Sequence, residues 1–284
     1  MQTNLDKTKI VVFRNGGILK QSEVWYYNNE KIDIVSFYKY LGIFFTPKLK
    51  WSKTQEMLSL QGMKASACIF RYQRKFGHLE PLDMFKIFDA MVKPILTYGA
   101  ELWGFKYIEK IEAVQIKFCK QYCNLYKNTA NVLALGECGR YPLCITYIPK
   151  CIKYWLNILK MDNHRYPKQC YNMLKRFDDA GRNTWATEIK NVLFMYGFGY
   201  VWIAQDIGDE FAFLNLFKQR LRDCYLQKWH DSVNNLSKAF HYKSFKSLLE
   251  IETYLTMDLS YKLRRTLSNF RCSGHSLMVE RGRH

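Results

Sequence analysis

The sequence has no long apolar run, and this absence excludes two membrane-related interpretations. The stretch from Met1 to Asn15 carries charges throughout and lacks the apolar centre of a secretory signal peptide. Nowhere does the chain approach the roughly 18 uninterrupted apolar residues that a membrane-spanning helix needs. These absences predict a protein of the cytosol or the nucleus, neither secreted nor inserted in a membrane.

Paired cysteine spacing is also lacking. The nine cysteines are odd in number and scattered, which favours reduced thiols over a disulfide framework. We predict that the thiols lying among apolar residues pack in the core: Cys119, Cys123, Cys138, Cys144 and Cys151.

Motifs for catalysis are equally scarce. Two-metal phosphoryl transfer usually needs paired aspartates. The one adjacent pair, Asp178-Asp179, lies in a polar segment that Gly181 follows. This surrounding sequence predicts a surface turn near a helix end. Gly16-Gly17 lacks the Gly-Lys-Ser/Thr of a phosphate loop. No Ser/His/Asp or Cys/His nucleophile arrangement stands out, so the residues alone indicate a binding module without a visible active site.

One pair of residues has metal-ligand spacing. Cys272 and His275 are separated by two residues, which is half of a tetrahedral zinc site. Within this chain only His284 follows them as a further ligand type. We therefore predict unpaired exposed residues and no metal site.

Aromatic residues and basic charge are abundant. With 48% hydrophobic residues, including 20 Tyr, 19 Phe and 7 Trp, the 284-residue chain can build a core. The 43 Lys and Arg against 25 Asp and Glu give a net charge of +18. Such charge favours a polyanion as partner, nucleic acid first and an anionic membrane surface second. The alternative is a solvated cationic surface with no specific partner.

The N-terminal part predicts strands. Lys9–Phe13 is a β-branched run before a turn at Asn15–Gly17, and Val24–Val35 forms a hairpin whose turn contains Asn28 and Asn29. Phe37–Phe45 is a third strand, interrupted at Gly42 where another part of the chain approaches closely.

A basic amphipathic helix is predicted from Gln55 to Phe76, capped by Ser52 or Thr54. Its apolar face consists of Leu58, Gly62, Ala65, Ile69, Tyr72 and Phe76. The cations on and before this helix suit a phosphate backbone: Lys48, Lys50, Lys53, Lys64, Arg71, Arg74 and Lys75.

The rest of the chain predicts helices. Their ranges are 82–92, one opening at Pro94, 108–125, 148–161, 169–177, 185–196, 213–229 and 243–254, with loops at 136–139, 197–200 and 232–238. An apolar face is expected to continue through Leu259, Leu263, Leu267 and Phe270, with Arg264 and Arg265 among the cations around it. The predicted fold class is α+β, mainly α, with a small N-terminal antiparallel sheet.

The segment Pro94–Gly104 joins the two halves of this pattern. It contains apolar residues and one charge, Glu101, and a buried carboxylate requires a partner because desolvating a lone charge costs several kcal/mol. We predict that Glu101 pairs with a cation or with backbone donors. Structural roles are assigned to Pro94, Tyr98, Gly99, Glu101, Trp103 and Gly104.

Four segments together resemble one family, the reverse transcriptases of non-LTR (LINE-type) retrotransposons. They occur in the family's order: Asn4–Phe13, Tyr38–Gly42, Pro94–Gly104, and Arg271–His275 with Glu280–Arg283. The resemblance covers essentially the whole chain. It implies the edge of the catalytic palm, the primer-grip strand, the thumb and post-thumb region, and the approach to a C-terminal Cys/His segment.

The resemblance also implies roles and boundaries. Lys7 matches the lysine of the last palm motif, a candidate proton donor to pyrophosphate, and Tyr40, Leu41 and Gly42 would lie near the primer terminus. The family's Mg²⁺-binding aspartates lie upstream of Asn4, so the chain is expected to be a fragment without cofactor ligands. The implied segments are 1–47 (palm and primer grip), 48–130 (thumb), 131–258 (connection) and 259–284 (basic C-terminal segment).

These observations predict a fragment of an RNA-directed DNA polymerase that binds RNA or an RNA–DNA duplex and does not polymerise alone. The predicted contacts are Lys7, Lys9, Tyr40, Leu41, Gly42, Lys48, Lys50, Lys53, Lys64, Arg71, Arg74, Lys75, Arg264 and Arg265. The alternative is a helical protein-interaction module whose basic charge is incidental. The sequence leaves the oligomeric state open.

Overall fold

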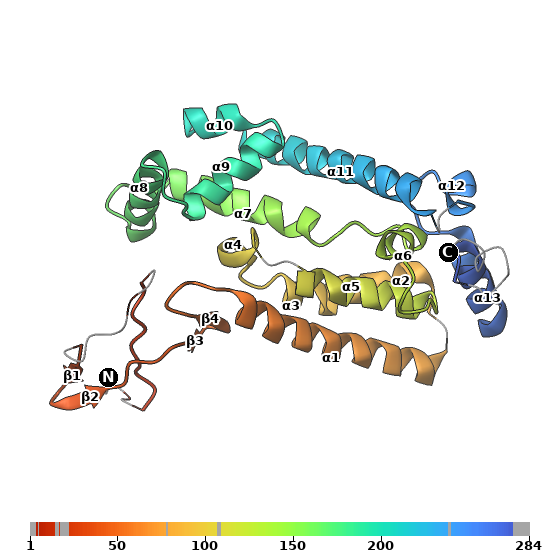
Figure 1. The fold of residues 1–284 in the computed structure, drawn as a ribbon, viewed down its shortest axis with the longest axis horizontal. Helices are drawn as coiled ribbons and strands as arrows, with labels where there is room; N and C mark the ends of the chain where they lie inside the picture. The colour runs from red at the N-terminus through yellow and green to blue at the C-terminus, as the bar shows by residue number, and fades with distance from the viewer. Residues whose placement is uncertain are drawn as a thin grey trace.

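A computed structural model describes residue 4 and residues 6–14, 17, 23–77, 79–106, 109–237 and 240–274. The described chain is mainly helical, with two small antiparallel hairpins at its N-terminal end (Figure 1). The α+β, mainly α class predicted from the sequence is therefore confirmed. His275 and the segment Glu280–Arg283 lie outside the described residues.

The two hairpins lie at one end of the molecule (Figure 1). In the first, β1 (Trp25–Tyr27) pairs with β2 (Glu30–Ile32). Asn28 and Asn29 both adopt the left-handed conformation that a tight two-residue hairpin turn requires, as predicted. Phe37–Phe45 folds differently from the prediction: it forms a second hairpin, β3 (Tyr38–Tyr40) and β4 (Ile43–Phe45), in place of one interrupted strand.

Lys9–Phe13 does not form a regular strand. Only Ile10 makes an isolated parallel bridge, to Ile34, with the backbone bonds Ile10 N–H to Asp33 O and Val35 N–H to Ile10 O. The remaining backbone of the run has no adjacent strand among the described residues, so the prediction of a strand was wrong.

The first layer of helices follows the hairpins. It contains α1 (Ser52–Phe76), α2 (Pro81–Met91), α3 (Lys93–Leu96), α4 (Ala100–Trp103) and α5 (Glu109–Tyr122). The N-cap of α1 is Trp51, without a side-chain cap, because the Thr54 hydroxyl accepts the Phe44 amide at 2.9 Å. The predicted cap at Ser52 or Thr54 was therefore wrong. Gly62 of α1 allows the close approach of Leu96, which packs over it.

A second layer lies above the first in Figure 1. It contains α7 (Cys144–Leu159), α8 (Tyr166–Asp179), α9 (Trp185–Met195), α10 (Gly199–Ala204) and α11 (Glu210–Asn235). α7 begins where the Leu143 and Cys144 amides donate to the Glu112 carboxylate of α5, each at 2.9 Å. Its apolar residues pack into a core with Trp202, Phe213 and Phe217.

The far end of the molecule is closed by α6 (Asn131–Glu137), α12 (Tyr242–Phe245), the 3-10 helix η2 (Thr253–Leu255) and α13 (Tyr261–Arg271) (Figure 1). Trp229, Val233 and Tyr242 pack here against Leu133 of α6. The first core extends from Ile43 to Leu255, so it joins this end to the α1–α5 layer.

Several predicted element boundaries were wrong. The helices α6 and α10 were not expected, α11 continues through part of the loop expected at 232–238, and only α12 and η2 form within the helix expected at 243–254. Glycines caused the first two errors, because Gly136 and Gly199 were interpreted as breakers, although Gly136 lies within α6 and Gly199 is the first residue of α10. Pro94 opens no single long helix, since α3 and α4 are separated by Thr97–Gly99.

None of the described helices combines the length and the apolar character required to cross a membrane.

Candidate nucleic-acid interface

The tip of the β3–β4 hairpin packs on the segment Pro94–Gly104. Leu41 and Gly42 form its turn with φ of 46° and 83°. The Tyr98 hydroxyl donates to the Leu41 carbonyl at 2.8 Å, and a Cβ on Gly42 would lie 3.2 Å from the Tyr98 ring. The close approach predicted at Gly42 is therefore that of an aromatic ring. Two motifs that lie more than 50 residues apart in the chain meet here.

Gly99 completes this junction. It adopts φ 62°, and a Cβ there would lie 2.8 Å from Ile43 Cδ1 of β4. The Trp103 indole, which is buried, donates to the Tyr98 carbonyl at 3.0 Å. Gly104 is buried against Tyr147 of α7, so the segment links the hairpin to both helical layers.

The prediction that the Glu101 carboxylate pairs with a cation or with backbone donors was wrong. The side chain is half-buried in the first turn of α4, and its carboxylate makes no ion pair or hydrogen bond within the described residues. It avoids the cost of lone burial because it retains contact with solvent. The link from this residue to the second layer is made by its backbone carbonyl, which accepts the Trp185 indole at 2.9 Å.

Four of the predicted cations lie along the outer face of α1: Lys53, Lys64, Arg71 and Lys75. At 3.6 residues per turn their positions fall within about 40° of one line, and at 1.5 Å per residue the line is about 33 Å long. The buried residues Leu58, Gly62 and Ile69 occupy the opposite face. None of the four cations is ion-paired within the described chain. We call these four residues the α1 stripe.

The stripe begins beside the hairpin. The Lys53 ammonium lies 3.0 Å from the centroid of the Phe37 ring and 5.1 Å from that of Phe44. These contacts hold the first cation of the stripe against aromatic side chains. Tyr40 and Leu41, at the hairpin tip, are exposed by 59% and 71%.

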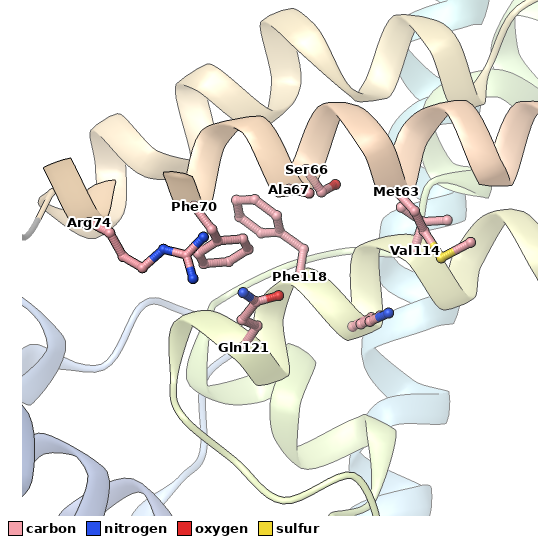
Figure 2. Close-up of a pocket in the computed structure, with 9 residues that line it drawn as sticks. Met63, Ser66, Ala67, Phe70, Arg74, Val114, Phe118 and Gln121 are labelled. Atoms are coloured by element: carbon pink, nitrogen blue, oxygen red, sulfur yellow. The ribbon is translucent and has the colours of Figure 1, made fainter. Parts of the chain in front are cut away.

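Arg74 lies beside the stripe, at a small cavity of about 130 Å³ between α1 and α5. Figure 2 shows Arg74 near Phe70 of α1, with Phe118 and Gln121 of α5 opposite. Lys117 also lines this cavity. Its volume is below that of typical small-molecule pockets, so it holds at most a side chain or a few waters.

The other predicted N-terminal contacts are scattered. Lys48 and Lys50 are exposed in the turn before α1. Lys9 pairs with Asp33 at 2.7 Å, and this hydrogen bond and charge hold the pKa of the Asp33 carboxyl below its ordinary value. Lys7 is exposed, and its carbonyl accepts the Tyr38 hydroxyl at 2.9 Å.

The two C-terminal arginines differ from the prediction. Arg264 is buried, and its Nη2 donates to the Met257 carbonyl at 3.0 Å, so it is not available to a phosphate. Arg265 is exposed and lies over the Tyr126 ring. The buried positions of α13 are Arg264, Ser268 and Asn269. Of the predicted apolar face, Leu259 and Leu267 pack against the core, whereas Leu263 and Phe270 are exposed. The predicted apolar face was therefore right for two of its four residues.

A buried polar network holds α13 in place, and the sequence did not reveal it. The Glu137 carboxylate of α6 accepts the Tyr254 hydroxyl at 2.7 Å and the Arg271 Nε at 2.9 Å. Arg271 also pairs with Glu252, which pairs with Lys246. The network explains the polar inner face of α13, because Ser268 bonds Tyr254 at 2.9 Å.

Most of the thiols predicted to lie in the core are buried there. Cys119, Cys123, Cys138 and Cys151 are buried and Cys144 is half-buried, which confirms core packing. Burial raises the pKa of Cys138 well above its ordinary value. Cys272 is also buried, contrary to the prediction of exposure.

Asp178 is buried and pairs with Lys190 at 3.1 Å, so the predicted surface turn is a salt-bridged helix end. Asp179 is exposed and pairs with Lys175 at 3.0 Å. No group of three or more metal-ligating side chains occurs in the part of the chain that the structure describes.

Comparisons with protein-family models, with curated proteins and with solved structures found no match.

Proposed function

We propose that this chain is a reverse-transcriptase-derived module that binds RNA or an RNA–DNA duplex through backbone phosphates. The observation that carries the proposal is the α1 stripe: cations without acidic partners along the outer face of one straight helix. Phosphate contacts by lysine and arginine supply most sequence-independent affinity for nucleic acids. The thumb-like role of α1 and the four-segment division of the chain belong to the same proposal.

The dimensions of the stripe suit a duplex. Its length of about 33 Å is of the same order as one helical turn of a duplex, which is about 34–36 Å in B-form DNA. Because the cations repeat at intervals of 4 to 11 residues along one line, they can contact phosphates on one side of a duplex without a deep pocket. The exposed Tyr40 at the adjoining hairpin offers an aromatic face to a base at the end of the duplex.

Anisotropy of a fluorescent RNA–DNA duplex tests the proposal in 50 to 200 mM NaCl. The unmodified chain should bind at 50 mM and lose affinity steeply as salt rises. The double variant Lys64→Gln/Arg71→Gln should bind more weakly, and the slope of log K against log[salt] should fall by about 1.8 because two phosphate contacts are lost. The control Lys127→Gln/Lys262→Gln has the same net charge as the stripe variant, but it changes two exposed lysines that lie outside α1.

Two outcomes would overturn the proposal. One is the absence of duplex binding at 50 mM NaCl, which would favour the helical protein-interaction module. The other is equal weakening in the stripe variant and in the control, because the affinity would then follow net charge alone.

The module is proposed to bind without polymerising. A primed RNA template with deoxynucleotides and Mg²⁺ should remain unextended in the presence of this chain. Extension above that of a heat-denatured sample would show that the chain carries its own catalytic residues.

A further inference from the structure

A cavity of about 670 Å³ lies where the two helical layers meet, away from α1. It is bounded by α7, by α11 and by the segment that connects α6 to α7. None of its described lining residues is acidic, and six are basic: Lys93, Arg140, Lys150, Lys153, Lys218 and Arg222. Its volume falls within the range of about 300–1,000 Å³ that is typical of small-molecule sites.

Two helix faces supply most of the positive charge. Lys150 and Lys153 lie one turn apart on α7, and Lys218 and Arg222 lie one turn apart on α11. The two helices pack side by side in Figure 1. None of these four side chains forms an ion pair within the described residues. All four are exposed, so solvent screens their mutual repulsion, and a multivalent anion between them would offset what remains of it.

Arg140 is fixed at the cavity wall. Its guanidinium donates to both oxygens of Asp89, at 2.9 and 2.5 Å, and to Gln115 at 3.2 Å. Lys93 shares the same carboxylate at 3.6 Å. Burial alone would raise the pKa of Asp89, but the hydrogen bonds and charge of Arg140 hold it below its ordinary value.

The Asp89 carboxylate is shared by Arg140 and Lys93. One negative charge therefore faces two positive charges, and the cavity keeps an excess of positive charge even beside its acidic neighbour. Tyr141, with the Arg222 guanidinium over its ring, and Phe211, which is 76% exposed, add aromatic surface.

We propose that this cavity binds an oligophosphate group, two or more linked phosphates, as found in nucleoside triphosphates and in inorganic polyphosphate. Linked phosphates carry several negative charges within a few ångströms, which matches cations contributed from opposite sides of one cavity. Arginine forks and lysine ammonium groups are the usual protein partners of phosphate oxygens. The site shares no residue with the α1 stripe, so it is independent of duplex binding.

Titration calorimetry with sodium tripolyphosphate in 150 mM NaCl tests the inference. The unmodified chain should bind, and the variant Lys153→Gln/Lys218→Gln should bind at least about tenfold more weakly. The stripe variant Lys64→Gln/Arg71→Gln and the control Lys127→Gln/Lys262→Gln lose the same charge and should bind as the unmodified chain does. All the changed residues are exposed, so unchanged circular dichroism and a cooperative melting transition would confirm that each variant is folded.

A second titration with ATP distinguishes the two sources of this chemistry. Tighter binding of ATP than of tripolyphosphate would indicate a nucleotide whose base contacts Tyr141 or Phe211, and equal or weaker binding would indicate a free oligophosphate. Both results support the proposal.

Three results would overturn it. These are no tripolyphosphate binding, equal weakening in all three variants, and binding of single-stranded RNA that depends on Lys153 and Lys218 while tripolyphosphate does not bind. The last result would make the cavity part of an RNA surface. The stripe variant separates this test from the proposed function, because failure of duplex binding would leave tripolyphosphate binding unchanged.

Discussion

Glu137 has no exposed surface, and its carboxylate accepts hydrogen bonds from Tyr254 and Arg271. A charge in this position is stable only while its partners remain, because removal of one partner leaves another charge buried without compensation. The network connects α6 to the end of α13, so a single side chain governs the closure of one end of the molecule.

We expect Glu137→Gln to lower the free energy of unfolding by about 3–5 kcal/mol, the usual cost of breaking a buried ion pair. Urea denaturation followed by tryptophan fluorescence measures this change. The control is Glu109→Gln, at an exposed position that forms no ion pair within the described residues, and it should change stability by less than about 0.5 kcal/mol. Similar losses in both variants would show that the network does not stabilise the fold.

Glu112 makes a pH-dependent contribution. Burial raises the pKa of its carboxyl above the ordinary 4.5, although the Leu143 and Cys144 amides donate to it and oppose the shift. The folded chain therefore holds this proton more tightly than the unfolded chain, and its contribution to stability falls as pH rises above about 4.5. Glu112→Gln removes this dependence.

Unfolding of both proteins between pH 4 and pH 7 tests this expectation. The free-energy difference, unmodified chain minus Glu112→Gln, should decrease as pH rises through the lower part of that range and then level off. A difference that grows with pH would show that the two amides outweigh burial and lower the pKa.

Residue pairing was the least predictable property. The sequence directed attention to Glu101, which keeps contact with solvent, whereas Glu112 and Glu137 are the carboxylates held by buried donors. Nothing local distinguishes them, since their partners are 31 and 117 residues away in the chain. Burial and long-range partners depend on how helices assemble, and a linear pattern does not contain that information.

At the scale of elements, glycines at helix ends fix how closely neighbouring segments approach. Gly139, which follows α6, adopts φ 58°, and a Cβ there would lie 2.6 Å from the backbone carbonyl carbon of Glu250. Gly181, which follows α8, adopts φ 77° with nothing within 4 Å of the same position. Both glycines have a backbone conformation that is unfavourable for other residues, but only Gly181 has room for a Cβ atom.

We expect Gly181→Ala to cost about 1–2 kcal/mol from the left-handed backbone alone. Gly139→Ala should cost a further 1–3 kcal/mol or so, because backbone atoms cannot move aside as the end of a flexible side chain can. Thermal or urea unfolding of the two variants gives the difference. Equal losses would mean that the segment at residue 250 moves freely away from α6.

Amphipathic spacing predicted the first part of α1 and failed at its end. Leu58, Gly62 and Ile69 form the buried face as expected, whereas Tyr72 and Phe76, predicted on the same face, are exposed by 59% and 70%. The Asn28-Asn29 turn forms as expected. Short elements failed, because helices of four to seven residues such as α6 and α10 are too brief to produce a periodic signal.

At the scale of the whole molecule, the net charge of +18 acts against the folded state through self-repulsion. Raising NaCl from 20 to 200 mM shortens the Debye length from about 20 Å to about 7 Å. We therefore expect the urea midpoint of the unmodified chain to rise over this range of salt.

The cavity variant Lys153→Gln/Lys218→Gln provides a sensitive comparison. It removes two of the clustered cations, so it should be more stable than the unmodified chain at 20 mM NaCl and should respond less to added salt. A midpoint that falls with salt in both proteins would indicate that attractive ion pairs outweigh the net repulsion.

The long-range pairing of Glu137 also has a consequence for synthesis on the ribosome. Arg271 follows Glu137 by 134 residues, which at about 5–20 residues per second corresponds to roughly 7–27 s of elongation. Until Arg271 has been synthesised, the Glu137 carboxylate lacks its arginine partner, and burying this charge alongside α6 is energetically unfavourable. The end of the molecule that contains α6 is therefore completed last, and any pause in translation between residues 137 and 271 prolongs the time that this nascent surface is open to chaperones and proteases.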